Sequence, residues 1–289
     1  MLAAGLGQTI ARADDESAAT GTNAIVSPES IPGFFSWLDA RSAYYRDFFP
    51  EPLLVEDTGL EEGEIEFNEL HTQANDQQSD VGEVEVQKSF GLMTFNLDLP
   101  YERYSDADDV AQGIGNVELG ARYPLYQKVS ANGWLDDTLG AELEVGIPVN
   151  SQVSQNAELE PEVFNDLRLT EHFSLQTVLG YSTLFGGGDQ GGLQTFEYGF
   201  AFGYLLTEQE LRLPGVQDLT LLLELSGERQ MNQENTGDDS LLGSLGFRLN
   251  FKPLGELQSS LGLGWIFPVD NGAREEVHWG IATSLIFGF

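Results

Sequence analysis

Cysteine is absent from the 289 residues of this chain, and basic residues are scarce. Without cysteine the chain can form no disulfide framework, no thiolate zinc site and no cysteine nucleophile. Lys and Arg number 13 against 47 Asp and Glu, which gives a formal net charge of -34. Because a phosphate backbone is bound by cations that replace its counterions, we expect no nucleic-acid partner.

Long hydrophobic runs are also missing from the sequence. No stretch comes near eighteen uninterrupted apolar residues, so the sequence predicts no transmembrane helix. This absence does not exclude a membrane β-barrel, because only every second residue of a barrel strand needs to be apolar.

Motifs of common enzymes and cofactor sites are missing as well. The chain has no P-loop, no Rossmann fingerprint and no G-x-S-x-G elbow, and its only histidines are His71, His172 and His278. We therefore expect no enzyme, no catalytic residue and no cofactor. The alternative is a lipid hydrolase that carries a Ser, His and Asn or Asp site on the outer wall of a barrel.

The N-terminal region differs in composition from the rest of the chain. Ala11 and Ala13 have the spacing of an A-x-A cleavage site, so residues 1–13 are expected to be a signal-peptide remnant, with a disordered N-terminus as the alternative. Residues 14–63 are expected to form a disordered leader, a short aromatic helix over 34–49 and an acidic connector. Three roles remain open for this helix: a plug, an interfacial anchor, or a helix packed beneath the end of a barrel.

From residue 64 onward the chain alternates between predicted strands and turns. Alternation with a period of two predicts β-strands. The expected fold is all-β, with residues 64–289 forming a single antiparallel transmembrane β-barrel of about 12 strands. The predicted strands cover residues 64–71, 81–89, 92–102, 114–126, 138–149, 160–169, 173–185, 193–206, 217–230, 240–252, 257–268 and 276–289.

Each predicted strand has one apolar column and one column rich in glycine and charge. Phe196, Tyr198 and Phe200, for example, alternate with Glu197 and Gly199. A soluble β-sandwich also alternates, so alternation alone does not tell which column meets solvent. Most segments are longer than the five or six residues of typical soluble strands, and nine to eleven tilted residues cross a bilayer. We therefore predict that the apolar column faces lipid and the glycine-rich column faces a narrow lumen.

The last strand, EVHWGIATSLIFGF, ends the chain on an aromatic residue. Its alternating Leu285, Phe287 and Phe289 resemble the assembly signal of outer-membrane β-barrels. The resemblance implies a bacterial outer-membrane location, contact with outer-membrane lipid and lipopolysaccharide, and recognition by the barrel-assembly machinery.

Three further stretches carry a more specific resemblance: GIGNVELGARYPLYQ from Gly113, LGAELEVGIPVN from Leu139 and LQTVLGYSTLFG from Leu175. They resemble the outer-membrane barrels of the meta-pathway phenol-degradation family, which are transporter-like. Asn116 stands where the family pattern has Asp, and Pro148 to Asn150 depart from the expected P-T-G. The resemblance covers roughly residues 81 to 289 and implies a passage route for small, often aromatic solutes.

A barrel of twelve strands has a backbone diameter of roughly 24 Å, which leaves a bore of about 10 Å or less once side chains are added. Acidic rings favour cations in a pore. We therefore expect a channel for small solutes that prefers cations or neutral molecules, with internal ion pairs that close the lumen as the alternative. The expected acidic lining is Glu64, Glu66, Glu83, Glu85, Asp98, Glu118, Glu142, Glu144, Glu197 and Glu224; the expected basic lining is Arg122, Arg168, Arg248 and Lys252.

Two further expectations concern metal binding and the alternative function. The acidic loops at Ser105 to Asp109 and Asp238 to Asp239 lack an EF-hand pattern, so we expect them to be solvated and expect no dedicated metal site. The alternative function is a non-conducting outer-membrane barrel with a structural or partner-binding role.

Overall fold

A computed structural model describes residues 49–60, 63–75, 77–106, 109–128, 135–150, 152–186, 190–232, 237–255 and 257–289. The predicted signal-peptide remnant and all of the predicted aromatic helix except Phe49 lie outside these described residues.

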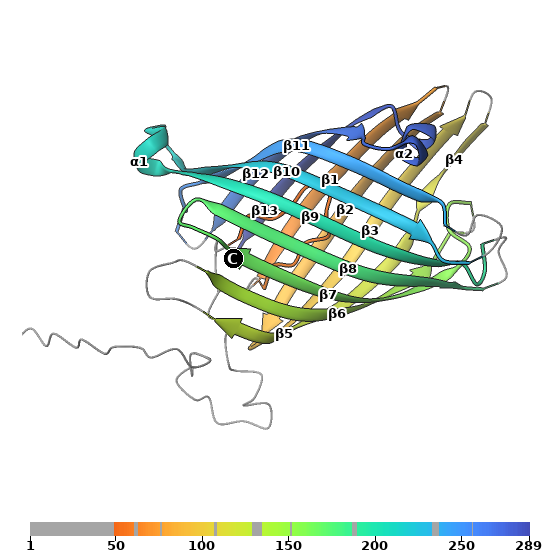
Figure 1. The fold of residues 1–289 in the computed structure, drawn as a ribbon, viewed down its shortest axis with the longest axis horizontal. Coiled ribbons are helices and arrows are strands. Elements are labelled where there is room, and N and C mark those ends of the chain that lie inside the picture. The colour runs from red at the N-terminus through yellow and green to blue at the C-terminus, as the bar shows by residue number, and fades with distance from the viewer. Residues whose placement is uncertain are drawn as a thin grey trace, which may run out of the picture.

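One antiparallel sheet contains every long strand and closes on itself (Figure 1). Neighbouring strands in the ring are mostly neighbours in sequence, and the pairing of β2 with β3 and of β1 with β13 completes the closure. The strands are β1 (Gly63–Ala74), β2 (Gln77–Phe90), β3 (Met93–Asp106), β4 (Asp109–Ile114), β5 (Asn116–Lys128), β6 (Asp136–Pro148), β7 (Ala157–Arg168), β8 (Phe173–Phe185), β9 (Gln194–Thr207), β10 (Val216–Gln230), β11 (Asp239–Phe251), β12 (Gln258–Pro268) and β13 (Trp279–Gly288).

The thirteen named strands form a ring of twelve, because β4 and β5 occupy one position in it. β3 pairs with β5 through residues 94–98 and with β4 through residues 101–106. Gly115 separates the two parts, and its backbone N–H donates to the Pro100 carbonyl at 3.0 Å. The predicted all-β barrel of twelve antiparallel strands is therefore confirmed.

The connections differ from prediction in three places. Two short helices, α1 (Glu208–Leu211) and α2 (Asn271–Glu276), occupy links that were predicted to be loops. The Asp270 side chain accepts a hydrogen bond from the Ala273 N–H and begins α2, so the last strand starts at Trp279 and the predicted start at Glu276 is wrong. The long connection implied between the predicted strands 92–102 and 114–126 is also wrong, because residues 101–106 of β3 pair with residues 109–114 of β4 and extend the hairpin.

The strand turns gather at two ends of the barrel. We call the end that carries the C-terminus and the β2–β3, β7–β8, β9–β10 and β11–β12 links the C-terminal end, and the other the distal end. At the C-terminal end Phe90 pairs with Met93, so Gly91 and Leu92 form a two-residue turn. Gly91 has a φ of 69°, as the first position of such a turn requires, and a glycine adopts this φ without strain.

The apolar column of the strands faces outward and the polar column faces the lumen, as predicted. Outward-facing Leu223 is 42% exposed, and its cross-strand neighbours Phe202 and Leu245 are 43% and 50% exposed. Inward-facing Glu224, by contrast, is 0% exposed. An apolar outer face with a polar interior is the arrangement of a barrel whose exterior meets hydrocarbon. Among the described residues, no helix is long and apolar enough to cross a membrane.

If the apolar column faces lipid, a charged side chain placed on it should destabilise the protein, and the more so the closer it lies to the middle of the bilayer. Leu223→Arg, near the middle of β10, should lower the free energy of unfolding by about 2–4 kcal/mol, because a guanidinium there must leave water for hydrocarbon. Urea unfolding of protein folded into lipid vesicles would measure this change.

Leu213→Arg is the matched control, since Leu213 is 50% exposed but lies in the link between α1 and β10. This change should cost about 0–1 kcal/mol. If both substitutions lowered the free energy of unfolding by the same amount, the assignment of Leu223 to the lipid-facing side would be contradicted.

Candidate functional site

Residues 49–60, which we call the luminal segment, lie inside the barrel. They enter at the C-terminal end, where Phe49 and Pro50 line a cavity, and return there to the start of β1. Val55, Thr58 and Leu60 are buried. The sequence predicted an acidic connector from residue 51 onward and considered a plug only for the aromatic helix over 34–49. The barrel wall therefore encloses part of its own chain.

The carboxylate of Glu224 on β10 holds the middle of the luminal segment. Its Oε2 accepts hydrogen bonds from three successive backbone N–H groups, those of Leu53 at 3.0 Å, Leu54 at 2.7 Å and Val55 at 3.1 Å. Hydrogen bonds to a charged acceptor are each worth about 1.5–3 kcal/mol. A buried acid predicted to line a pore thus binds the backbone of the luminal segment.

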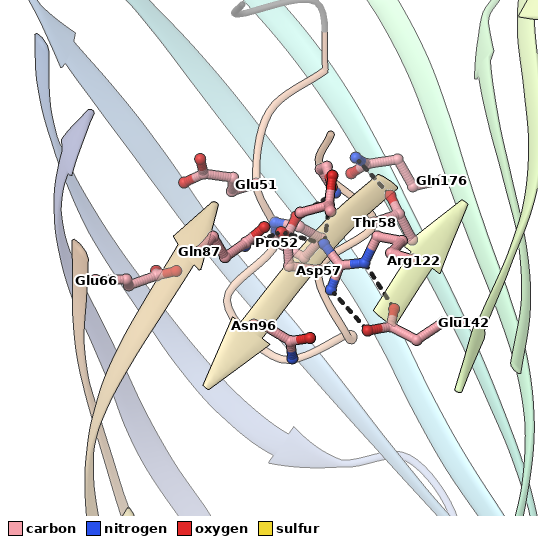
Figure 2. Close-up of polar contacts among 12 residues, drawn as sticks. Glu51, Pro52, Asp57, Thr58, Glu66, Gln87, Asn96, Arg122, Glu142 and Gln176 are labelled. Carbon is pink, nitrogen blue, oxygen red and sulfur yellow. Dashed lines mark hydrogen bonds and ion pairs between the residues drawn. The ribbon is translucent and has the colours of Figure 1, made fainter. Parts of the chain in front are cut away.

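Arg122 on β5 ties the luminal segment to the opposite wall. Its side chain is 1% exposed; Nε donates to Glu142 at 2.7 Å, and Nη1 donates to Asp57 at 3.0 Å and to the Gly59 carbonyl at 2.8 Å. Figure 2 shows the guanidinium between the wall carboxylate and Asp57. A buried guanidinium is tolerated when such partners satisfy it.

Arg248 on β11 makes a second tie. Its Nε donates to the Glu51 carbonyl at 2.8 Å, its Nη2 donates to the Pro52 carbonyl at 2.9 Å, and its Nη1 lies 3.2 Å from the Glu51 carboxylate. Five strands separate β5 from β11 on each side of the ring. The two guanidinium groups therefore hold the luminal segment from opposite sides of the lumen.

Apolar contacts complete this attachment. Val55 and Leu60 form a small core with three wall residues, Phe164, Val178 and Ala201. Burial of these apolar side chains stabilises the luminal segment against the barrel wall, in addition to its polar contacts.

Wall glycines leave the space that the luminal segment occupies. A Cβ added to Gly199 would collide with Val55, and one added to Gly262 would collide with Leu53. The sequence indicated a crowded lumen from its glycine-rich column, and the crowding comes in part from the chain itself.

Three hydroxyl and amide contacts position the rest of the luminal segment. The Thr58 hydroxyl donates to Asp166 on β7 at 2.7 Å, and Gln87 on β2 donates to Asp57 at 3.0 Å. Gln176 on β8 donates to Thr58 at 3.4 Å, as Figure 2 shows. Side chains from many strands thus converge on one short stretch of chain.

The predicted lining residues fall into three groups. Arg122, Arg248 and Glu224 hold the luminal segment. Lys252 follows the last residue of β11 and pairs with Glu208 of α1 at 2.6 Å, and Arg168 donates to the carbonyls of the adjacent turn; both thus belong to the C-terminal mouth. The remaining predicted acids lie on the inward-facing columns of β1, β2, β3, β5, β6 and β9: Glu64, Glu66, Glu83, Glu85, Asp98, Glu118, Glu142, Glu144 and Glu197.

β7 adds acids that the sequence prediction left out. Glu158, Glu160, Glu162 and Asp166 share the inward column with buried Phe164. Their alternate spacing is visible in the sequence and could have identified them. Asp57, by contrast, could not have been identified, because its luminal place depends on the path of a segment outside the strands.

Each mouth of the barrel has a cavity. The cavity at the C-terminal end has a volume of about 150 Å³ and is lined by Glu51, Arg168 and Phe289, among others. The cavity at the distal end has a volume of about 490 Å³, with Tyr104 and Asp106 in its wall. Phe49, Pro50 and Glu51 of the luminal segment line the cavity at the C-terminal end, and none of residues 49–60 lines the cavity at the distal end.

The residues of the predicted assembly signal close the ring. Leu285 and Phe289 are exposed on the outward column, and Phe287 packs edge-on against Phe67 of β1 with ring centroids 6.4 Å apart. Their role in recognition by the assembly machinery stays a prediction.

Comparison with known proteins supports the architecture. An outer membrane channel from Pseudomonas putida F1 superposes with a TM-score of 0.55 at 18% identity, over 83% of this chain and 99% of that one. The porins NanC and KdgM give TM-scores of 0.45 and 0.43 at 8% and 15% identity; each match covers 78% of this chain, with 98% and 99% of those chains. No family model and no curated protein matches the chain.

The closed antiparallel barrel, its apolar outer face and its polar lumen define the class: this is a β-barrel of the kind found in bacterial outer membranes, with the fold of the Pseudomonas channel. The resemblance to the phenol-degradation family stays a prediction, since no family model matches.

The role of Glu224 can be tested by the reactivity of a single thiol. In a Val55→Cys background, Glu224→Gln should raise the rate of maleimide labelling by about tenfold or more, because loss of the charge weakens three hydrogen bonds that hold residues 53–55. Labelling would be followed on folded protein in detergent.

Glu228→Gln on the same strand is the control, since the hydrogen bonds to residues 53–55 come from Glu224. An equal rate increase in both variants would show that the anchor lies elsewhere.

Proposed function

We propose that this protein is an outer-membrane channel for small cations and small neutral solutes, closed in the observed conformation by its luminal segment. The observation that carries the proposal is the lumen itself: a polar, strongly acidic interior whose centre holds residues 49–60. Passage requires the luminal segment to move.

The size of the barrel supports small solutes. Twelve strands leave a bore of about 10 Å or less, which suits ions and metabolites. The luminal segment narrows this bore further, because its anchors lie on opposite walls. Small aromatic molecules enter the proposal through the family resemblance alone.

The charge of the wall supports a preference for cations. Acidic side chains line most of the inward columns from β2 to β9, whereas Arg122 and Arg248 already bind Glu142, Asp57, Glu51 and Pro52. Carboxylates that these two guanidinium groups do not neutralise give the lumen a negative potential. Such a potential attracts cations and repels anions.

A sealed barrel with a structural or partner-binding role is the second candidate. The number and burial of the anchors favour it: three hydrogen bonds to Glu224, two arginine ties and an apolar core act on one short segment. The two candidates differ in whether the luminal segment leaves the lumen.

Ion preference tests the first candidate. In a planar bilayer with a KCl gradient, the reversal potential should have the sign of K⁺ permeation, because the lumen wall is acidic. Neutralising Glu160→Gln together with Glu162→Gln should reduce this preference. A reversal potential with the sign of Cl⁻ permeation would overturn the proposal.

A reversible crosslink tests whether the luminal segment is the gate. A Cβ added to Gly199 would lie 3.3 Å from the Cβ of Val55, close to the spacing of a disulfide, and the chain has no other thiol. The Val55→Cys, Gly199→Cys protein should show few openings when oxidised and recover them on reduction.

The single variants Val55→Cys and Gly199→Cys should not respond to the redox change and serve as controls. Equal conductance of the oxidised and reduced double variant would exclude gating by residues 49–60. Silence of the reduced double variant and of the wild-type protein would favour the sealed barrel.

A further inference from the structure

Three carboxylates meet on the inner wall where β3, β5 and β6 run side by side. Asp98, Glu118 and Glu144 each provide an oxygen, and the three oxygens lie within 4.8 Å of one another. Asp98 is the cross-strand partner of Glu118, and Glu144 is the partner of Gly120, the next inward residue of β5. Like charges that lie opposite each other on neighbouring strands destabilise a sheet, so a positive charge bound beside these carboxylates would stabilise it.

Arg122 does not supply that charge by direct contact. Its hydrogen bonds go to Glu142, to Asp57 and to the Gly59 carbonyl, which lie on the neighbouring stretch of wall and on the luminal segment. The guanidinium is therefore engaged away from Asp98 and Glu118.

Two buried oxygens beside the cluster have no hydrogen-bond partner among the described residues. Asp98 and Asn96 are each 5% exposed. The Asn96 Nδ2 donates to Asp98 Oδ2 at 2.9 Å and to Glu144 Oε2 at 3.4 Å, but Asp98 Oδ1 and Asn96 Oδ1 accept nothing. A buried acceptor without a partner is costly, so Asp98 Oδ1 indicates a missing ligand. Asn96 Oδ1 lies beside Gly120 and reaches the carboxylates only when the amide turns.

Gly120 provides the room for Asn96 to reach this place. A Cβ at Gly120 would collide with the Asn96 amide, so only glycine leaves the amide free to extend from β3 towards Glu144 of β6. The amide nitrogen and oxygen exchange places on a half turn of the side chain. That turn would present a neutral oxygen to a cation held by the carboxylates.

We propose that Asp98, Glu118 and Glu144, assisted by the Asn96 amide oxygen, bind one Ca²⁺ ion in the lumen. The donors are all oxygens, as hard cations require, and calcium takes them at about 2.3–2.6 Å. The three oxygens lie within 4.8 Å of one another, close enough to share one calcium ion. Calcium is favoured over magnesium because magnesium demands near-ideal octahedral geometry and gives up its water ligands reluctantly. The site departs from the sequence expectation of no dedicated metal site, and it does not depend on conduction.

A second acidic cluster allows a specific calcium site to be distinguished from the general attraction of cations to an acidic lumen. Glu158, Glu160 and Glu197 also place their oxygens within 4.8 Å of one another. All three are half-buried, and none has a buried oxygen without a partner. This cluster is therefore a control for counterions that any acidic lumen attracts.

Calorimetric titration of CaCl₂ into the full-length protein, purified in detergent and freed of metal with EDTA, tests the proposal. We expect one saturable site, with Mg²⁺ binding about tenfold more weakly or worse. Asp98→Asn and Glu144→Gln should each weaken calcium binding by about tenfold or more, because each removes one negative charge from the ligands and calcium affinity follows that charge. Glu197→Gln should change it by less than about twofold.

Folding of each variant would be checked by heat-modifiable migration on a denaturing gel. Gly120→Ala is a further variant that keeps every carboxylate and displaces only the amide, and it too should weaken binding. Folded wild-type protein that binds no calcium saturably would overturn the proposal. So would an equal loss of affinity in Glu197→Gln and Asp98→Asn, which would show diffuse attraction by the lumen.

Discussion

Two guanidinium groups on opposite walls of the lumen join the barrel to the stretch of chain inside it. Arg122 and Arg248 each contact a wall carboxylate and backbone carbonyls of the luminal segment. A buried charge without partners is strongly destabilising, so each arginine is compatible with its place only while the luminal segment or an equivalent group is present. Displacement of the luminal segment must therefore bring water or solute to these arginines.

The glycine-rich inner column follows from the same constraint. Leu53 and Val55 occupy space in front of Gly262 and Gly199, where a larger side chain would exclude them. Small residues on the wall thus allow a narrow barrel to hold both its charged network and a folded stretch of chain. Close packing then adds dispersion contacts to the hydrogen bonds.

The remaining inner wall is unevenly charged. Acids dominate from β2 to β9, while Glu224 and Arg248 on the other side are already paired with the luminal segment. Carboxylates that face a narrow, low-dielectric lumen repel one another, which favours bound cations or permeating ones. The charge balance of the chain, -34 overall, is therefore partly a property of the interior of the barrel.

The sequence by itself determined the class of fold and which side of each strand faces lipid. Side chains alternate along a strand with a period of two, so lipid-facing and inward-facing residues can be told apart within each strand. It also placed Arg122, Glu142 and Glu224 on inward columns. Only the tertiary structure decided that residues 49–60 enter the lumen and meet Glu224, more than 160 residues away in sequence. No local pattern encodes such contacts, since they arise only when the closed ring brings distant strands around one segment.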